Sequence, residues 1–249
     1  MSRLVISGYY GFGNAGDEAM LAAILEAILE VVPEADITVI SGNPRHTAEK
    51  HGVKAVGRFD VTGIFNAIKR CDLLISGGGS LLQDVTSNRS LYYYLSIISL
   101  ANMLGKKVML YAQGIGPLRK PMARKAVGRV LNHVDYITVR DERSKGELLS
   151  MGVTKVPIEV TADAVLAMHP VDTTIGQRLL KDYKLSGVKY RLGVSVRNWK
   201  NCTAYRASLA NALDPSIRAA AALGPKTANP RARSTSAASS GVWMAAMRL

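Results

Sequence analysis

A glycine-rich segment near the N-terminus, GYYGFGNAGDEAM at positions 8–20, contains the spacing G-x-G-x-x-G that is typical of a dinucleotide-binding turn. Asp17 and Glu18, however, occupy the first turn of the helix that should follow, where a pyrophosphate would lie, and their charges would repel it. The second strand ends in ISGN at positions 40–43, without the acid that binds a ribose. No Gly-Lys-Ser/Thr follows the glycines either. These residues argue against both a dinucleotide site and a P-loop.

Polar side chains in the same segment favour a different ligand. Asn14, Asp17 and Glu18 supply acceptors and one donor group, which suits sugar hydroxyls. Asp17 and Glu18 are then candidate general bases. The alternative interpretation is an N-cap followed by stabilising first-turn acids, and the spacing does not decide between the two. The glycines that would line a sugar site are Gly11, Gly13 and Gly16.

A second glycine cluster, SGGGSLLQD at positions 76–84, follows another strand and precedes a helix. Three consecutive glycines, Gly77, Gly78 and Gly79, cost backbone entropy, which favours close approach of a ligand. Ser80 and Gln83 would be its polar contacts. The alternative is a turn that only needs positive φ.

Two further polar segments follow later strands. The first is QGIGP, which contains Gln113 and Gly114. The second begins with Arg140 and Asp141; the guanidinium either binds a carboxylate or phosphate in a forked manner or pairs with the neighbouring acids. Asp163, after a further strand, is an N-cap or a ligand contact. The three consecutive tyrosines at 92–94 either stack on a sugar ring or pack in the core.

Alternating strands and helices are predicted to position these segments. Apolar runs typical of buried parallel strands are separated by longer helical patterns, which predicts a doubly wound α/β fold, a Rossmann-like N-terminal domain over residues 1–170. Such folds bind ligands at the carboxyl ends of the strands, where the glycine and polar segments fall. The predicted strands are 4–7, 37–41, 73–76, 107–112 and 136–139, and the predicted helices are 17–32, 61–71, 89–104, 119–134 and 141–151.

The pattern breaks in the last third of the chain. We expect a linker over 171–187 and the start of a second α/β domain over 188–214, with a strand at 188–197 and a helix at 203–213. Residues 215–249 are rich in Ala, Ser, Pro and Arg and contain no acid. This tail is either a natural flexible end or a frameshifted or truncated one. A lone strand and helix cannot make a core, which favours a truncated second domain.

Composition limits the remaining classes of function. The net charge of +13 indicates an anionic partner or simply a basic surface. Two distant cysteines and four histidines show no metal-ligand spacing, so we expect no metal site, surface histidines and a reducing cytoplasm. No signal peptide is evident, and the apolar stretch at 91–104 is too short to span a bilayer.

Taken in order, the segments GYYGFGNAGDEAML, SGGGSLLQDVTSNRSLYYYL, AQGIGP, VRDERS and TADAVL resemble the polysaccharide pyruvyl transferases, most closely the bacterial CsaB type. The resemblance covers roughly residues 1–214. It implies a two-domain architecture similar to GT-B glycosyltransferases, with the active site between the domains. It also implies transfer of pyruvate from phosphoenolpyruvate, as a cyclic ketal, to a cell-wall polysaccharide sugar, commonly N-acetylmannosamine.

The resemblance implies roles for particular residues. Asn14, Asp17 and Glu18 would face the acceptor sugar, and the cluster from Gly77 to Gln83 would line the cleft. Gln113, Gly114, Arg140 and Asp141 match later family segments. Arg197, in the predicted first strand of the second domain, matches a position that faces the donor.

This chain departs from the family in two places. Ala164 stands where the family usually has proline after Ala-Asp. More seriously, the tail replaces most of the second domain, where the family's donor-binding histidine and basic residues would lie. His169 falls in no family segment. These departures leave two alternatives open for this chain: an active transferase, or one that is inactive through truncation.

The implied partners are phosphoenolpyruvate and a lipid-linked or polymeric cell-wall glycan, with no cofactor and no nucleic acid. A cytoplasmic location with peripheral contact at the inner membrane face suits the basic charge. The alternative functions are a GT-B-type nucleotide-sugar glycosyltransferase, which would consume a UDP-sugar, and a non-catalytic sugar-binding remnant.

Overall fold

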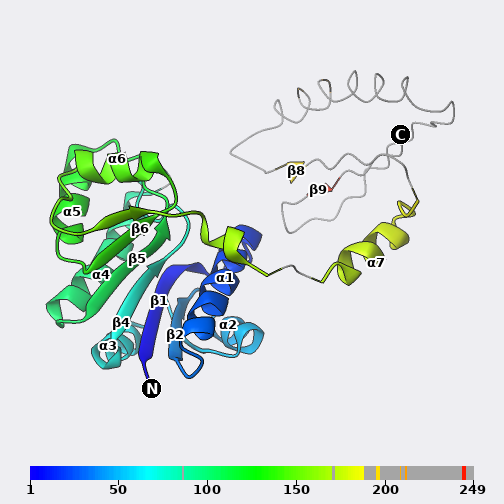
Figure 1. The fold of residues 1–249 in the computed structure, drawn as a ribbon, viewed down its shortest axis with the longest axis horizontal. Helices are drawn as coiled ribbons and strands as arrows, with labels where there is room; N and C mark the ends of the chain where they lie inside the picture. Colours follow the sequence, from blue (N-terminus) through cyan, green and yellow to red (C-terminus); the bar gives the residue numbers. More distant parts are fainter. Residues whose placement is uncertain are drawn as a thin grey trace. The chain divides into compact units, whose positions relative to one another are not determined.

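We describe the chain from a computed structural model (Figure 1). The structure describes residues 1–85, 87–169 and 172–187, together with 195–196, 208, 211 and 243–244. The chain divides into two compact units, Met1–Pro170 and Val171–Leu249, and each is described by itself.

The first unit is built on a seven-stranded sheet in which every neighbouring pair of strands is parallel. The strand order is β3-β2-β1-β4-β5-β6-β7, so the order reverses between β1 and β4. In folds of this kind, that reversal marks the crevice where ligands bind. The strands are β1 (Arg3–Tyr10), β2 (Asp36–Ser41), β3 (Lys54–Gly57), β4 (Leu73–Gly77), β5 (Lys107–Gln113), β6 (Tyr136–Val139) and β7 (Ile158–Val160).

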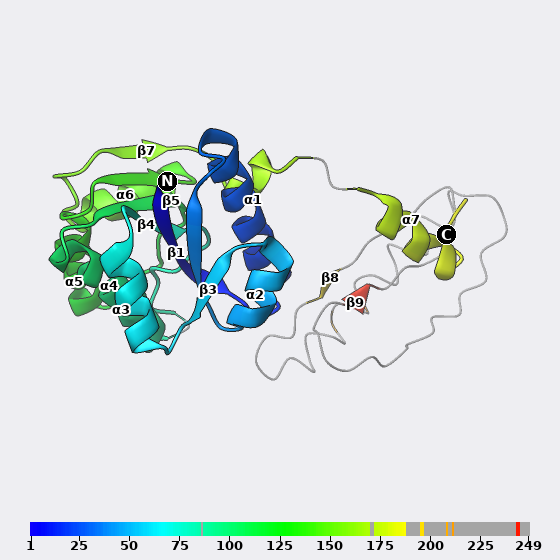
Figure 2. The ribbon, with the colours of Figure 1, turned by 90° about the horizontal axis from the view of Figure 1, so that it is seen from below.

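Helices cover both faces of this sheet. Helices α3, α4 and α5 pack on one face, and α1 packs on the other, with α2 beside β2 and β3 (Figure 2). The doubly wound α/β architecture is therefore confirmed. The helices are α1 (Ala15–Val31), α2 (Pro44–His51), α3 (Val61–Arg70), α4 (Asn88–Met103), α5 (Pro121–Leu131), α6 (Glu142–Ser150) and the 3-10 helix η1 (Ala164–Ala167).

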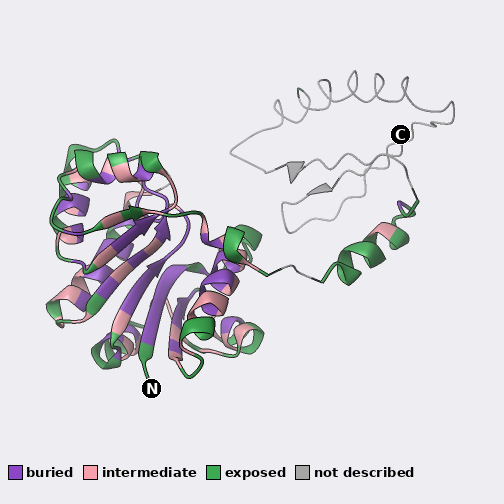
Figure 3. Cartoon of the chain, in the orientation of Figure 1, coloured by how far each residue is buried: buried purple, intermediate pink, exposed green. Residues whose placement is uncertain are grey.

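Two apolar clusters form the core, one on each face of the sheet (Figure 3). Ile68, Leu91 and Leu110 are fully buried in the larger cluster under α3, α4 and α5. Ile6 and Ile24 are fully buried in the smaller cluster under α1. The strands are apolar on both faces because helices cover both, as a parallel sheet requires.

All five strands and all five helices predicted over residues 4–151 are present, with small differences at their ends. The sequence analysis did not identify α2 and β3. Helix α2 spans only PRHTAEKH, a polar segment with Pro44 in its first turn and Gly52 as a left-handed C-cap at φ 64°. Its single buried residue, Thr47, leaves no apolar periodicity to detect.

In the second unit, helix α7 (Thr174–Asp182) lies within the stretch predicted as a linker. A short antiparallel pair joins β8 (Ser195–Val196) to β9 (Trp243–Met244). Apart from these residues and positions 208 and 211, the predicted second-domain strand and helix and the tail over 215–249 lie outside the described residues. In the described parts of the chain, no helix has the length and apolar character needed to cross a bilayer.

Candidate functional site

The reversal of strand order places the two glycine segments side by side. One follows β1 and the other follows β4, the two strands that flank the reversal. A β-carbon placed on Gly79 would lie 3.4 Å from Asp17 Oδ1 and 3.3 Å from Met20 Cε. The half-buried Asp17 carboxylate therefore faces the triglycine backbone across this crevice.

The first glycine segment is held by its own polar residues. The Asn14 side chain caps α1 and accepts the Gly16 N–H at 3.2 Å. Gly11 and Gly13 have φ of 78° and 71°, which other residues rarely adopt. Glu18 is 7% exposed, and its Oε1 accepts the Gly11 N–H at 2.8 Å. Glu18 thus fastens the loop to the helix that follows it.

Two basic side chains of α2 lie close to the other carboxylate oxygen of Glu18. Lys50 Nζ is 4.0 Å and His51 Nε2 is 3.8 Å from Glu18 Oε2. Burial and the Lys50 charge lower the pKa of His51, although Glu18 opposes this shift. The expectation of a surface side chain is wrong for His51, whose side chain is 8% exposed.

The charge of Asp17 affects a buried tyrosine of the same segment, Tyr10. Burial, followed by the charge of Asp17, raises the pKa of Tyr10. The Tyr10 hydroxyl donates to the Gly77 carbonyl at 2.9 Å, which ties β1 to the start of the triglycine segment. A β-carbon on Gly77 would lie only 2.8 Å from that hydroxyl, so the position has room for glycine alone.

Gln113 holds the triglycine segment from the neighbouring strand. It is completely buried, and its Nε2 donates to the carbonyls of Gly78 at 3.3 Å and Gly79 at 3.4 Å. Its Oε1 accepts the Ser76 hydroxyl at 3.3 Å. Ala112, the residue before Gln113, has φ of 47°, which is an uncommon value for a residue with a side chain. The Gln113 side-chain amide therefore holds the triglycine backbone in place.

Arg140 lies at the centre of a second polar group on the same edge. Its Nη1 donates to Asp163 Oδ2 at 3.1 Å, its Nη2 donates to Ser80 Oγ at 3.3 Å, and its Nε is 3.5 Å from Asp141 Oδ2. A β-carbon on Gly114 would lie 2.7 Å from the Ser80 hydroxyl and 2.8 Å from Arg140 Cζ. Glycine at position 114 therefore makes the space that the guanidinium occupies.

The two acids around Arg140 also cap helices. Asp141 caps α6 by accepting the Ser144 N–H at 2.7 Å, and Asp163 caps η1 by accepting the Val165 N–H at 3.2 Å. Hydrogen bonds from Ser144 and, to a smaller extent, the Arg140 charge lower the pKa of Asp141. The structure thus shows the pairing alternative for Arg140 and the N-cap alternative for Asp163.

Two predicted site residues remain, Gln83 and Arg197. Gln83 Oε1 accepts the Val85 N–H at 3.0 Å, so the side chain folds onto its own segment. Arg197 lies outside the described residues. Of the three tyrosines, Tyr92 is 45% exposed, Tyr93 is half-buried and Tyr94 is buried, so the helix divides them between surface and core.

Sequence reasoning missed an aromatic and basic group at the same edge. Arg58 directly follows β3, and its guanidinium lies over the rings of Phe12, Phe59 and Tyr93. These residues are scattered over three segments. The signal that was available was Phe12 inside the first glycine segment together with the tyrosines of α4.

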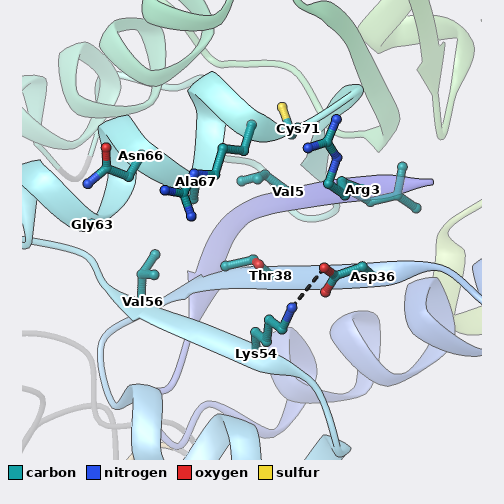
Figure 4. Close-up of a pocket in the computed structure, with 12 residues that line it drawn as sticks. Arg3, Val5, Asp36, Thr38, Lys54, Val56, Gly63, Asn66, Ala67 and Cys71 are labelled. Atoms are coloured by element: carbon teal, nitrogen blue, oxygen red, sulfur yellow. Dashed lines mark hydrogen bonds and ion pairs between the residues drawn. The ribbon is translucent and has the colours of Figure 1, made fainter. Parts of the chain in front are cut away.

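A cavity of about 430 Å³ lies away from this edge (Figure 4). Its lining includes Arg3, Asp36 and Lys54, the first residues of β1, β2 and β3, so it opens toward the amino ends of these strands. Lys54 Nζ pairs with Asp36 Oδ2 there at 2.7 Å. Across the described residues, no three His, Cys, Asp or Glu side chains gather as they would around a metal ion.

The fold is that of a Rossmann-like α/β domain, and glycine, a carboxylate and a paired arginine lie at the carboxyl edge of its sheet. The profile of one family, polysaccharide pyruvyl transferase, matches residues 14–217. The chain belongs to this family, which makes its class a transferase.

Searches of known proteins add little to this assignment. No curated protein matches the chain. Among solved structures, the Anabaena protein HepE, crystallised with UDP and glucose, is similar at 8% identity and a TM-score of 0.45, over 74% of this chain and 50% of that one. An AraC family transcriptional regulator from Pseudomonas putida is similar at 12% identity and a TM-score of 0.37, over 75% of this chain and 94% of that one. The chain spans half the length of HepE, and neither likeness bears on function.

Proposed function

We propose that this protein is a CsaB-type pyruvyl transferase, which joins pyruvate from phosphoenolpyruvate to a sugar of a cell-wall glycan as a cyclic ketal. N-acetylmannosamine in a lipid-linked or polymeric glycan is the proposed acceptor, and the proposed location is the cytoplasm, with peripheral contact at the inner membrane face. The observation that carries the proposal is the Asp17 carboxylate facing the triglycine backbone at the point where the strand order reverses. Family membership supplies the class of reaction.

The reaction needs a proton donor, a proton acceptor and a site for anions. A general acid protonates the methylene carbon of phosphoenolpyruvate, and one sugar hydroxyl adds to the neighbouring carbon as it loses its proton. A second hydroxyl then displaces phosphate from the same carbon. The products are the ketal, whose former methylene is now a methyl group, and inorganic phosphate.

Asp17 suits the role of the base that receives the hydroxyl proton. Its carboxylate faces the crevice, while that of the adjacent Glu18 is turned into the protein and holds Gly11. A general base must reach the proton that it removes. We assign Asp17 as the base and Glu18 as the residue that positions the loop carrying it.

Arg140 suits the binding of an anionic group of the donor. A guanidinium has five N–H donors, and the contacts with Asp163, Ser80 and Asp141 leave one on each Nη atom. The same contacts hold the group in one orientation, which reduces the entropy lost when an anion binds. Arg197, placed at the donor side by the family resemblance, remains a prediction.

The test is turnover by the full chain with phosphoenolpyruvate and an oligosaccharide that carries N-acetylmannosamine. We expect phosphate release together with a ketal on the oligosaccharide, seen by mass spectrometry. Asp17→Asn should lower kcat by roughly 10² to 10⁴-fold, the usual contribution of a general base. Glu34→Gln, which removes an exposed carboxylate of the same domain, is the matched control and should leave kcat unchanged.

Two results would count against this assignment. Consumption of a UDP-sugar in place of phosphoenolpyruvate would identify a glycosyltransferase. Undiminished turnover by Asp17→Asn would remove Asp17 from the role of base while leaving the class of reaction in place.

A further inference from the structure

An arginine at the carboxyl edge of the sheet is surrounded by aromatic rings. The guanidinium carbon of Arg58 lies 4.7 Å from the ring centre of Tyr93, 5.0 Å from that of Phe59 and 5.2 Å from that of Phe12. The Tyr93 hydroxyl donates to the Arg58 carbonyl at 3.0 Å, which joins α4 to the end of β3. We call these four residues the Arg58 cluster.

The charge of Arg58 has no acidic partner among the described residues. No carboxylate of the described chain forms an ion pair with its guanidinium, and its buried Nε has no hydrogen-bond partner there. The buried part of this guanidinium needs compensation, and stacking on rings supplies only part of it. The geometry therefore leaves this cation able to pair with an anion from outside the described residues.

Two rings of the cluster are exposed to solvent. Phe59 is 82% exposed and Phe12 is 43% exposed. Tyr9, 37% exposed, stacks on Phe12 with ring centres 4.3 Å apart, which enlarges the aromatic surface. Exposed aromatic faces beside a cation match a sugar ring that carries an anionic group, because the C–H faces of the sugar stack while the anion pairs.

The cluster is electrostatically connected to the proposed base. The Tyr94 ring packs edge-on against that of Tyr93 with ring centres 5.2 Å apart, and its hydroxyl is buried without a hydrogen-bond partner in the described chain. Burial raises the pKa of Tyr94, the Arg58 charge opposes this shift, and Asp17 adds to it. Asp17 and Arg58 therefore both act on one buried hydroxyl. Phe12 also belongs to the glycine segment that leads into Asp17.

We propose that the Arg58 cluster is a binding subsite for an acidic sugar, a monosaccharide unit that carries a carboxylate or a phosphate ester. The rings bind the sugar face, and the Arg58 guanidinium binds the anion. That this unit belongs to the acceptor glycan rests on the proposed function. Binding of the acidic sugar itself does not require any transfer of pyruvate.

Ligand-observed NMR titrations of the full chain test this subsite with glucuronate, glucose 6-phosphate and glucose. We expect both acidic sugars to bind at least about tenfold more tightly than glucose, in the range typical of single charge-assisted contacts. The tighter of the two identifies the preferred anion, and equal binding identifies charge as the recognised feature. Arg58→Gln should remove the preference, whereas Arg129→Gln, an exposed arginine of α5, should keep it.

Phe59→Ala provides a second variant that is compatible with folding, because this ring is 82% exposed. It should weaken all three sugars by at least about threefold while keeping the preference for the acids. The proposal is overturned if the wild-type chain binds glucose as tightly as the acids, if none of the three binds, or if Arg58→Gln keeps the preference. Acid-selective binding without ketal formation would retain this subsite and remove the proposed function, and the reverse result would do the opposite.

Discussion

Two arginines at the same edge of the sheet have different neighbours: carboxylates surround one of them, and aromatic rings surround the other. Arg140 touches the Asp163 and Asp141 carboxylates and the Ser80 hydroxyl, and Gly114 leaves the space for it. Arg58 touches three aromatic rings and, in the described chain, no carboxylate. The first cation is oriented by two carboxylates and a hydroxyl and can offer a ligand only its remaining N–H groups, while the second has no carboxylate partner among the described residues.

This contrast shows that a sequence motif does not reveal whether the charge of its arginine is compensated in the folded protein. The family segments pointed to Arg140, whose charge is already paired within the protein. Arg58, which has no carboxylate partner among the described residues, lies in none of the family segments. An arginine that supplies oriented N–H groups and one that supplies uncompensated charge are distinguished only by their neighbours.

The largest expected effect concerns the space around Arg140. In Gly114→Ala the new methyl group would lie 2.7 Å from the Ser80 hydroxyl and 2.8 Å from Arg140 Cζ, so the guanidinium must move. We expect the free energy of unfolding to fall by about 1–3 kcal/mol, the usual cost of overpacking. Urea denaturation followed by circular dichroism measures it.

Gly146→Ala is the matched control, because a β-carbon in this helical position meets nothing within 4 Å. It should raise the free energy of unfolding by about 0.5–1 kcal/mol. An unchanged denaturation midpoint for Gly114→Ala would show that the Arg140 site accommodates the added methyl group without loss of stability.

A smaller effect is expected when each arginine is replaced by lysine. Arg140→Lys loses the forked contacts with Ser80 and Asp163 and should cost about 1 kcal/mol, since these side chains are about one-third exposed and partly screened. Arg58→Lys retains a cation over the rings and should cost about 0.5 kcal/mol. Equal losses of the free energy of unfolding in the two variants would contradict the distinction drawn between the two sites.

A weaker effect should appear in the pH dependence of stability. The pKa of Asp141 is below its ordinary value, so its contribution to stability is present above that value and is lost as the pH falls through the folded-state pKa. The stability difference between the wild-type chain and Asp141→Asn should therefore shrink between about pH 5 and about pH 3.

The Arg58 cluster supplies the comparison for this titration. Because no described carboxylate pairs with Arg58, the difference between the wild-type chain and Arg58→Gln should stay constant over the same pH range. A parallel decline in both differences would mean that an acid also compensates Arg58.

The smallest effect is expected from Phe59→Ala. This ring is 82% exposed, so its loss should change the free energy of unfolding by no more than about 0.5 kcal/mol. A loss well above that value, measured by thermal denaturation, would indicate that the ring is part of the folded core and not a free surface of the Arg58 cluster.

Much of the architecture was predictable because buried parallel strands have a strong local signature. The runs LVIS, ITVIS and LLIS are apolar on both faces, and each proved to be a strand of the central sheet. The polar helix α2 and the short strand β3 lack that signature and were not identified. The failure to predict α2 and β3 matters for the site, because Arg58 directly follows β3 at the carboxyl edge of the sheet.

The candidate site was predictable only in its composition. The residue types at positions 17 and 18 are identical in charge, yet the structure turns Glu18 into the protein toward Gly11 and leaves Asp17 facing Gly79. Similarly, Gln113 supports the triglycine carbonyls from a fully buried position, which no spacing in the sequence indicates.

The sequence by itself determined the order of strands and helices, the glycines that permit close approach, and the set of polar groups at one edge, because these follow from local periodicity and chain connectivity. Tertiary structure alone decided which charges are neutralised. Arg58 meets Phe12 and Tyr93 from two other segments, and Arg140 meets Asp163 from another strand end. Charge pairing requires that residues far apart in the chain lie within a few ångströms of one another. They come that close only in the folded sheet.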